Sequence, residues 1–367
     1  MTTVRSCNGA SIEVPSCNNC RVRVLVTGSD GYIGSLLPPL LEARSHDCVG
    51  IDAGFYQGDP VFLPREGRPP TIKEDIRKLD VSHFEGVDAV VHMAELSNDP
   101  LGQLAPDITF DINHRGSLHV AETARAAGVS RFVYMSSCSV YGIAEEDIVD
   151  EDSPVRPQTV YAQCKQLVER DVAQLATDEF SPTFLRNATA YGASPNMRFD
   201  IVLNNLCGLA WTTGVIALLS DGTPWRPLVH AADICRAITE LLEAPRESVH
   251  NEVVNIGALG ANFQVRELAE IVASVFDGCE LSIGSSDADN RSYRVSFEKL
   301  RELLPSFECV WTPLRGANEL REAFESIPLS QDLFESSRFT RLRRIEGLRE
   351  TDALDAQLFW RASDAAV

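Results

Sequence analysis

The chain has 367 residues and a formal net charge of −20, with 44% hydrophobic and 23% charged residues. This is the composition of a globular protein with a sizeable core, and its acidity argues against nucleic acid or an anionic membrane surface as a general partner. No apolar run approaches the roughly 18 residues that a membrane-spanning helix needs, and the first residues lack the apolar core of a signal peptide. We therefore expect a cytoplasmic protein with neither a membrane nor a nucleic-acid partner.

The cysteines are scattered without a disulfide framework. Cys17 and Cys20 form one C-x-x-C pair, with Cys7 upstream. A zinc site would usually need a second such pair or histidines at ligand spacing, and neither is nearby. We therefore predict no metal site and a reducing compartment. Residues 1–20 are polar and aperiodic, and we interpret them as a flexible N-terminal extension.

Residues 21–34 carry the first strong signal. A valine-rich run at 22–26 predicts a buried strand, and Gly28, Gly31 and Gly34 follow it. In a dinucleotide-binding turn the first glycine allows the turn, the second lets the backbone approach a diphosphate, and the third lets helix and strand pack closely. The spacing G-x-x-G-x-x-G is weak evidence alone, because a loop that needs glycine only for its backbone conformation would look the same.

A carboxylate further along strengthens the dinucleotide interpretation. The apolar run 48–51 ends in Asp52, eighteen residues after the last glycine. A carboxylate there would accept both ribose hydroxyls of an adenosine and repel a 2′-phosphate, so the predicted cofactor is NAD rather than NADP. Asp75 and Ile76 lie in the segment 72–77 and could meet the adenine edge, although a surface acidic turn explains them equally well.

Strands and helices alternate along the next part of the chain. Buried strands are predicted at 88–94, 131–135 and 183–186, and helices at 110–127 and 161–176. Such alternation predicts parallel βαβ units with ligands at the carboxyl ends of the strands. The expected fold is therefore α/β, a doubly wound parallel sheet of the Rossmann type.

After residue 187 the alternation becomes less regular, which predicts a smaller C-terminal substrate-binding lobe. The expected organisation is a flexible extension (1–20), an NAD-binding domain (21–186), a mostly substrate-binding lobe interleaved with the end of the sheet (187–325) and a C-terminal helical extension (326–367). Within that last part, short surface helices are expected at 334–339 and 348–360.

Three side chains, Ser137, Tyr161 and Lys165, form a candidate catalytic set. Tyr161 and Lys165 are four residues apart on a predicted helix, so they project from one face. A lysine ammonium near a phenol lowers the pKa of the tyrosine, which suits proton exchange with a substrate hydroxyl. Ser137 ends a preceding strand, where its hydroxyl could bond the same substrate oxygen. Y-x-x-x-K alone would be ordinary helix surface, but the glycine turn and the upstream serine favour the catalytic interpretation.

In combination these motifs resemble those of the extended short-chain dehydrogenase/reductase family, specifically its NAD-dependent nucleotide-sugar epimerase and dehydratase branch. The resemblance covers about residues 22–325. Its motifs are T-G-x-x-G-Y-I-G at 27–34, D-I-R at 75–77, H-x-A at 92–94, S-S-x-x-V-Y-G at 136–142, Y-x-x-x-K at 161–165, L-R-N-A-T-x-Y-G at 185–192, R-x-x-x-H-x-x-D at 226–233 and R-x-Y at 291–293.

The resemblance implies roles for single residues. Tyr161 would be the acid/base, Lys165 would bind the nicotinamide ribose and tune Tyr161, and Ser137 would polarise the sugar oxygen. The implied cofactor-binding residues are Gly28, Gly31, Tyr32, Ile33, Gly34, Asp52, Asp75, Ile76, Met93, Ala94, Tyr161 and Lys165. The residues that would hold the nucleotide diphosphate are Asn187, Asn204, Arg226 and Arg291. Two guanidinium groups match two phosphates, although each arginine could instead form a surface salt bridge.

Two departures from the family pattern bear on the reaction. The 4,6-dehydratases that resemble this chain place Asp-Glu after the catalytic Ser or Thr, where this chain has Cys138 and Ser139. A serine hydroxyl does not titrate where Asp and Glu ionise, which disfavours a standard dehydratase. A thiol at Cys138 could exchange protons, or be a small residue packed under the sugar. Glu95 follows H-x-A, where the family usually has Ala or Gly, and could contact a sugar hydroxyl, act as an added acid/base or point into solvent.

The predicted function is an NAD-dependent nucleotide-sugar epimerase that acts at carbon 4 through a transient 4-keto sugar, with hydride returned from NADH. One alternative is a dehydratase, or a 3- or 5-epimerase, that uses Cys138 or Glu95 as acid/base. Others are a net NAD-dependent sugar dehydrogenase or reductase, and a non-catalytic module that binds NAD as a signal. The resemblance also implies a homodimer.

Overall fold

The computed structural model describes residues 2–5, 11–14, 21–58, 62–63, 69–97, 99–143, 147–218, 220–285 and 292–361. Of the predicted N-terminal extension it describes β1 (Thr2–Arg5) and β2 (Ser11–Val14), which pair antiparallel. Cys7, Cys17 and Cys20 lie outside the described residues. None of the described helices is both long and apolar enough to cross a bilayer.

A seven-stranded sheet forms the centre of the molecule, and all of its neighbouring strands are parallel. Its order is β12-β8-β7-β6-β3-β4-β5. The strands are β3 (Arg23–Thr27), β4 (Asp47–Asp52), β5 (Thr71–Lys73), β6 (Ala89–His92), β7 (Arg131–Ser137), β8 (Ser181–Asn187) and β12 (Glu252–Ile256). The order reverses between β3 and β6, and a doubly wound sheet binds ligands at such a point, beyond the carboxyl ends of its strands. The predicted fold class is confirmed.

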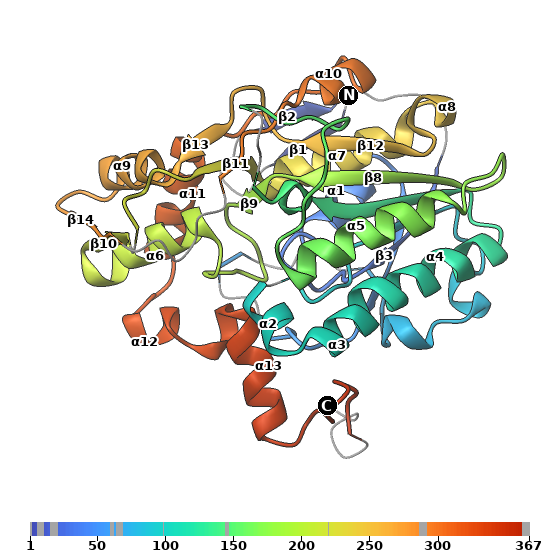
Figure 1. Ribbon diagram of the computed structural model, residues 1–367, viewed down its shortest axis with the longest axis horizontal. Coiled ribbons are helices and arrows are strands. Elements are labelled where there is room, and N and C mark those ends of the chain that lie inside the picture. Colours follow the sequence, from blue (N-terminus) through green and yellow to red (C-terminus); the bar gives the residue numbers. More distant parts are fainter. Residues whose placement is uncertain are drawn as a thin grey trace.

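Helices cover both faces of this sheet because side chains alternate along each strand. In β3, Val26 packs into the core on one face and Leu25 into the core on the other. The first face is covered by α1 (Leu37–Ala43), α7 (Ala231–Glu243) and α10 (Glu298–Leu303). The second is covered by α4 (Ser117–Ala126) and α5 (Val160–Ala173), which run side by side in Figure 1.

The helix expected at 110–127 begins earlier, at Pro106, and is divided into three parts. It consists of α3 (Pro106–Thr109), the π-helical η3 (Phe110–Gly116) and then α4. In η3, the side chain of Asn113 accepts a hydrogen bond from the backbone N–H of Leu96 (2.8 Å) and donates one to its carbonyl (3.1 Å). The π turn thereby fixes the loop that follows β6 and carries Glu95.

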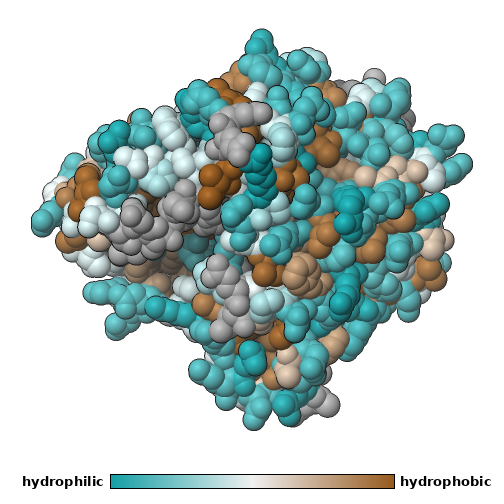
Figure 2. All heavy atoms as spheres, in the orientation of Figure 1, coloured by the Kyte–Doolittle hydropathy of each residue, from teal (hydrophilic) through white to brown (hydrophobic). Residues whose placement is uncertain are grey.

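A smaller lobe lies beside the sheet, at the left of Figure 1, and has an apolar core of its own. Its helices are α6 (Val202–Thr213), α9 (Val265–Val275) and α11 (Pro313–Glu325). Its strands are β9 (Thr189–Tyr191), β11 (Trp225–His230) and β13 (Asn262–Gln264), which form one sheet, and the parallel pair β10 (Val215–Leu218) and β14 (Glu280–Ile283). Figure 2 shows mostly hydrophilic side chains on this side of the molecule, with hydrophobic ones in small groups.

The C-terminal segment, residues 330–361, differs from its prediction. It contains α12 (Gln331–Phe334), η5 (Ser337–Phe339) and α13 (Arg341–Glu350), and lies near α2 (Asp99–Leu104) in Figure 1. The expected helix at 348–360 is wrong: after α13 the chain turns through Asp352 and Leu358, both with positive φ. Nor is the segment a surface appendage, since Phe339 packs in the core of the lobe and Ile345 in the core under α4 and α5.

The glycine turn depends on close contact that excludes a side chain. A Cβ added at Gly34 would lie only 2.1 Å from the carbonyl oxygen of Gly28. We expect Gly34→Ala to lower the free energy of unfolding by about 3 kcal/mol, because packed backbone has to move apart. The matched control is Gly347→Ala in α13, where an added Cβ meets nothing within 4 Å. There alanine should be neutral or stabilise by up to about 1 kcal/mol through helix propensity. Equal denaturation midpoints for the two variants would contradict this account.

Candidate active site

A cavity of about 660 Å³ opens at the carboxyl ends of the strands, between the sheet, the lobe and the C-terminal segment. It gathers the residues that the sequence assigned to the cofactor. The predicted cofactor residues that line it are Gly28, Gly31, Tyr32, Ile33, Gly34, Asp52, Asp75, Ile76, Met93, Ala94, Tyr161 and Lys165. Ser137, Asn187, Arg226 and Glu95 line the same cavity, so the predicted cofactor and substrate groups converge on one space.

The glycine turn fits the diphosphate of a dinucleotide. Gly28 has φ 73°, and a Cβ at this position would lie 2.9 Å from the backbone nitrogen of Ala94. At Gly31 a Cβ would lie 3.0 Å from the carbonyl oxygen of Gly28. Only bare backbone therefore faces the cavity here, as the approach of a diphosphate requires. The hydroxyl of Tyr32 points elsewhere, donating to the carbonyl of Gly192 (2.6 Å) and tying the turn to the lobe.

Asp52, which is predicted to bind the adenosine ribose, is held in the cavity wall by backbone donors. Its carboxylate accepts hydrogen bonds from the N–H groups of Asp30 (3.0 Å) and Gly54 (2.7 Å). Burial raises the pKa of Asp52 to about 6, because its effect is larger than that of the Gly54 hydrogen bond, which lowers the pKa. Asp75 also lines the cavity, but its carboxylate caps η1 (Ile76–Lys78) and forms an ion pair with Arg77 (2.6 Å). Asp52 and Asp75 therefore both line the part of the cavity predicted to bind adenosine, and carboxylates there would repel a 2′-phosphate.

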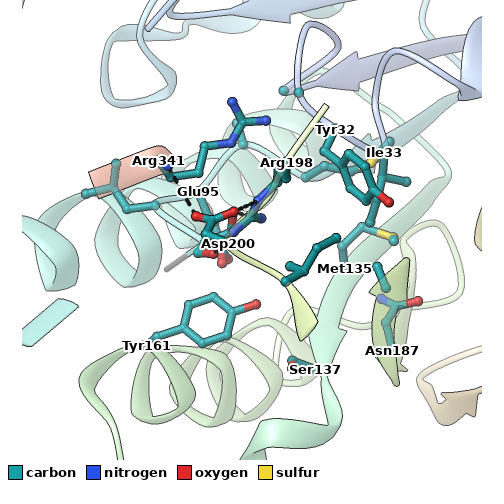
Figure 3. A pocket seen from close by; sticks show the side chains of 18 of the residues that line it. Tyr32, Ile33, Glu95, Met135, Ser137, Tyr161, Asn187, Arg198, Asp200 and Arg341 are labelled. Atoms are coloured by element: carbon teal, nitrogen blue, oxygen red, sulfur yellow. Dashed lines mark hydrogen bonds and ion pairs between the residues drawn. The ribbon is translucent and has the colours of Figure 1, made fainter. Parts of the chain in front are cut away.

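Lys165 and Tyr161 project from α5 toward the end of β7, which carries Ser137. In Figure 3 the Tyr161 ring extends into the cavity near Ser137 and Met135. The Lys165 ammonium is buried, with the residue only 4% exposed, and donates to the carbonyl of Met135. Burial raises the pKa of Tyr161; Lys165 lowers it, while Glu95 and Asp99 raise it further. The lysine acts in the predicted direction, but burial outweighs it and the net shift is upward.

Glu95 lines the cavity, but its side chain is buried and paired and does not point into solvent. Its side chain is 2% exposed and forms an ion pair with Lys165 (Oε2 to Nζ, 2.6 Å). Its other oxygen accepts a hydrogen bond from the hydroxyl of Tyr134 (2.6 Å). Burial lowers the pKa of Lys165, but Glu95 and Tyr161 raise it and prevail. The structure thus makes Glu95 the counterion of Lys165, a role that the sequence alone did not suggest.

Cys138 does not reach the cavity, which corrects its prediction as an acid/base. It begins η4 (Cys138–Tyr141) and is 1% exposed, and its thiol donates to the carbonyl of Arg186 (3.1 Å). Burial raises the pKa of the Cys138 thiol well above its ordinary value. The next residue, Ser139, lines the cavity instead. Sequence order alone could not tell which of the two side chains faces the site.

The substrate-binding predictions have mixed outcomes. Asn187 donates to the carbonyls of Ser136 and Leu185, while its Oδ1 is buried with no hydrogen-bond partner among the described residues. The prediction of Asn204 as a substrate-binding residue is corrected, because its side chain is fully buried and does not line the cavity. Its amide nitrogen donates to the carbonyls of Gly192 (3.2 Å) and Arg198 (3.0 Å), and its Oδ1 accepts from the N–H of Gly192 (2.9 Å). Its role is to shape the lobe. Arg291 lies outside the described residues.

A group of charged residues on the far wall of the cavity was not among the predicted site residues. Arg198 forms an ion pair with Asp200 (2.8 Å), and both line the cavity with Arg341. Figure 3 places Arg198, Asp200 and Arg341 across the cavity from Tyr161. The first two stand in no motif quoted above, and Arg341 lies in the segment interpreted as a surface extension. Only tertiary contact brings them to the site.

Comparisons with known proteins agree with this geometry. A sequence model described as "NAD dependent epimerase/dehydratase family" matches residues 24–257. Among characterised relatives, a UDP-glucose 4-epimerase from Bacillus subtilis is 27% identical over 289 residues, covering 69% of this chain and 81% of its own.

Solved structures share the fold. MoeE5 in complex with UDP-glucose and NAD is 27% identical, with a TM-score of 0.71 over 83% of this chain and 99% of its own. TunA, an NAD-dependent NDP-hexosamine 5,6-dehydratase involved in tunicamycin biosynthesis, has a TM-score of 0.75 over 84% of this chain and 99% of its own. Its identity is 23%, so that likeness concerns the fold alone.

The ion pair between Glu95 and Lys165 predicts a change in pH dependence. Glu95→Gln removes a negative charge that raises the pKa of Tyr161. The phenolate then forms at lower pH, so the acidic limb of kcat/KM against pH should move to lower pH. Steady-state rates measured between pH 5 and pH 10 test this, with Tyr161→Phe as the control that removes the titrating group. A limb that stays in place would show that Glu95 does not set the Tyr161 equilibrium, and one that moves to higher pH would show that Glu95 acts mainly by keeping Lys165 charged.

Proposed function

The chain belongs to the NAD-dependent epimerase/dehydratase family, and from that membership we propose that it is a nucleotide-sugar epimerase acting at carbon 4. NAD is its cofactor. The observation that carries the proposal concerns the acid/base groups around Ser137 and Tyr161. Every carboxylate among the described residues lining the cavity already has a partner. These pairs are Asp52 with Gly54, Asp75 with Arg77, Glu95 with Lys165, Asp99 with Thr159 and Asp200 with Arg198.

A 4-epimerase needs only one acid/base group, whereas a dehydratase needs another to protonate the departing hydroxyl. Tyr161 is that one group. Its phenolate takes the proton of the sugar 4-hydroxyl, and Ser137 donates a hydrogen bond to the same oxygen. The chemistry that NAD supplies is reversible hydride transfer at carbon 4. Tyr161 would then return the proton to the same oxygen once the 4-keto sugar has turned over in the cavity, which completes the inversion at carbon 4.

Lys165 and Glu95 together influence the protonation of Tyr161. The ammonium favours the Tyr161 phenolate, and the carboxylate keeps the ammonium charged despite its burial. Asn187 and Arg226, which line the cavity, would bind the nucleotide sugar. Asn187 offers a carbonyl oxygen that has no hydrogen-bond partner in the described part of the chain, and Arg226 offers a guanidinium suited to a phosphate.

The names of the relatives support a nucleoside-diphosphate hexose as the substrate. The Bacillus subtilis relative is a UDP-glucose 4-epimerase, and MoeE5 binds UDP-glucose with NAD. A UDP-hexose is therefore the first substrate to test. The family resemblance further suggests a cytoplasmic homodimer that pairs through α5.

Product mass separates the proposed reaction from its rivals. The protein is incubated with UDP-, GDP-, dTDP- and ADP-sugars in deuterated water without added NAD(H). A new chromatographic peak with unchanged sugar mass is the expected result. Loss of water would instead establish a dehydratase, and one deuteron gained without that loss a 3- or 5-epimerase. Tyr161→Phe should lower the rate by about 10²- to 10⁴-fold, the range of a lost general acid/base.

Cys138→Ala provides a second discrimination. Because the thiol lies outside the cavity, this variant should retain kcat within about threefold while losing about 1 kcal/mol of stability through the small void left behind. Thermal unfolding and initial rates are measured together. A fall in kcat comparable with that of Tyr161→Phe, at normal stability, would return Cys138 to the chemistry.

A further inference from the structure

The C-terminal segment brings a buried arginine into the wall of the cavity. Arg341 is the first residue of α13, is 2% exposed and lines the cavity together with its two neighbours in sequence. Its backbone N–H donates to the carboxylate of Asp200 (3.2 Å). Its guanidinium carbon lies 4.0 Å from the centre of the Tyr56 ring. The side chain is thus held between the lobe and the loop that follows β4.

This guanidinium lacks a full set of partners. Its Nη1 is buried and has no hydrogen-bond partner among the described residues. Asp200, the carboxylate beside it, already forms an ion pair with Arg198. Burial, together with the charge of Arg198, lowers the pKa of Arg341 to about 10. Asp52 also acts on this guanidinium, but neither it nor Asp200 is hydrogen-bonded to Nη1. A buried charge is costly unless its donors are satisfied, so Nη1 favours an incoming anion.

The position of Arg341 indicates which anion this guanidinium would bind. Tyr56, under its guanidinium, is four residues beyond Asp52, the carboxylate at the adenosine end. Asn196 joins this loop to the glycine turn, because its side-chain amide donates to the carbonyls of both Tyr56 and Asp30. Arg341 therefore lies where the adenosine end meets the glycine turn. A dinucleotide places its diphosphate at that turn.

We propose that Arg341 binds the diphosphate of NAD, with its unpartnered Nη1 donating a charge-assisted hydrogen bond to a phosphate oxygen. The glycine turn meets the diphosphate from the sheet side, and α13 meets it from the opposite side. The C-terminal segment is thus a wall of the cofactor site. This inference depends on NAD being the cofactor and does not depend on which sugar carbon the enzyme inverts.

Binding measurements on cofactor-free protein test it. Arg341→Met keeps the aliphatic stem against Tyr56 and removes the charge, while Arg341→Lys keeps a charge. The matched control is Arg349→Met, which removes an exposed arginine at the other end of α13. Dissociation constants are measured by calorimetry for NAD, ADP, adenosine and UDP. We expect Arg341→Met to weaken the binding of NAD and of ADP by about 10- to 100-fold and to leave the affinity for adenosine unchanged. Arg341→Lys should bind NAD and ADP with intermediate affinity, and Arg349→Met should bind them as tightly as the parent protein does.

Three results would overturn the proposal. The first is an unchanged affinity for NAD. The second is an equal loss for adenosine, which would mean that Arg341 shapes the site without binding the diphosphate. The third is a loss confined to UDP, which would assign the arginine to the substrate.

Thermal unfolding adds an independent readout. Cofactor-free Arg341→Met should unfold at or above the parent Tm, because an incompletely paired buried charge is gone, while the rise in Tm on adding NAD should shrink. A lower Tm without NAD combined with an undiminished NAD-induced rise would make the residue purely structural. No turnover is measured, so failure of the epimerase proposal would not affect the outcome.

Discussion

The arrangement of the active site depends on the burial of one ammonium group, that of Lys165. Removing such a charge from water costs several kcal/mol unless the protein supplies counter-charge and acceptors. Here they come from separate parts of the sheet edge: the carboxylate of Glu95 after β6 and the carbonyl of Met135 in β7. Tyr134 and Asn113 in turn hold Glu95 and its loop. The stability of this corner and the protonation of Tyr161 are therefore set by the same contacts.

The cofactor half of the site was predictable because its signals are local. The buried strand, the three glycines and the later acidic residue lie within a few dozen residues of one another. Each glycine is required because an added side chain would contact nearby backbone. Tyr161 and Lys165 were predictable for a similar reason, since helical spacing alone places them on one face. The alternation of strands and helices likewise fixes the parallel sheet and the edge at which ligands bind.

The predictions that failed depend on the direction in which a side chain points, or on contacts between residues far apart in the sequence. Whether Cys138 or Ser139 faces the cavity depends on a single turn of η4. Asn204 lies in a family position, yet its amide is used to bind the Gly192 loop. Arg341 reaches the site only because Ile345 and its neighbours complete a core built mainly from the first half of the chain. No periodic pattern encodes a contact between segments so far apart.

The place of α13 in that core has a consequence for how the protein matures in the cell. A ribosome completes the glycine turn, Asp52 and most of the parallel sheet well before it makes residues 341–358. Domains commonly begin to fold during synthesis, N-terminal part first. Here the emerging nucleotide-binding half would still lack Ile345, Leu348 and Leu354 beneath α4 and α5. Completion of the core beneath α4 and α5 is then a late event in biogenesis, timed by the arrival of the C-terminal segment.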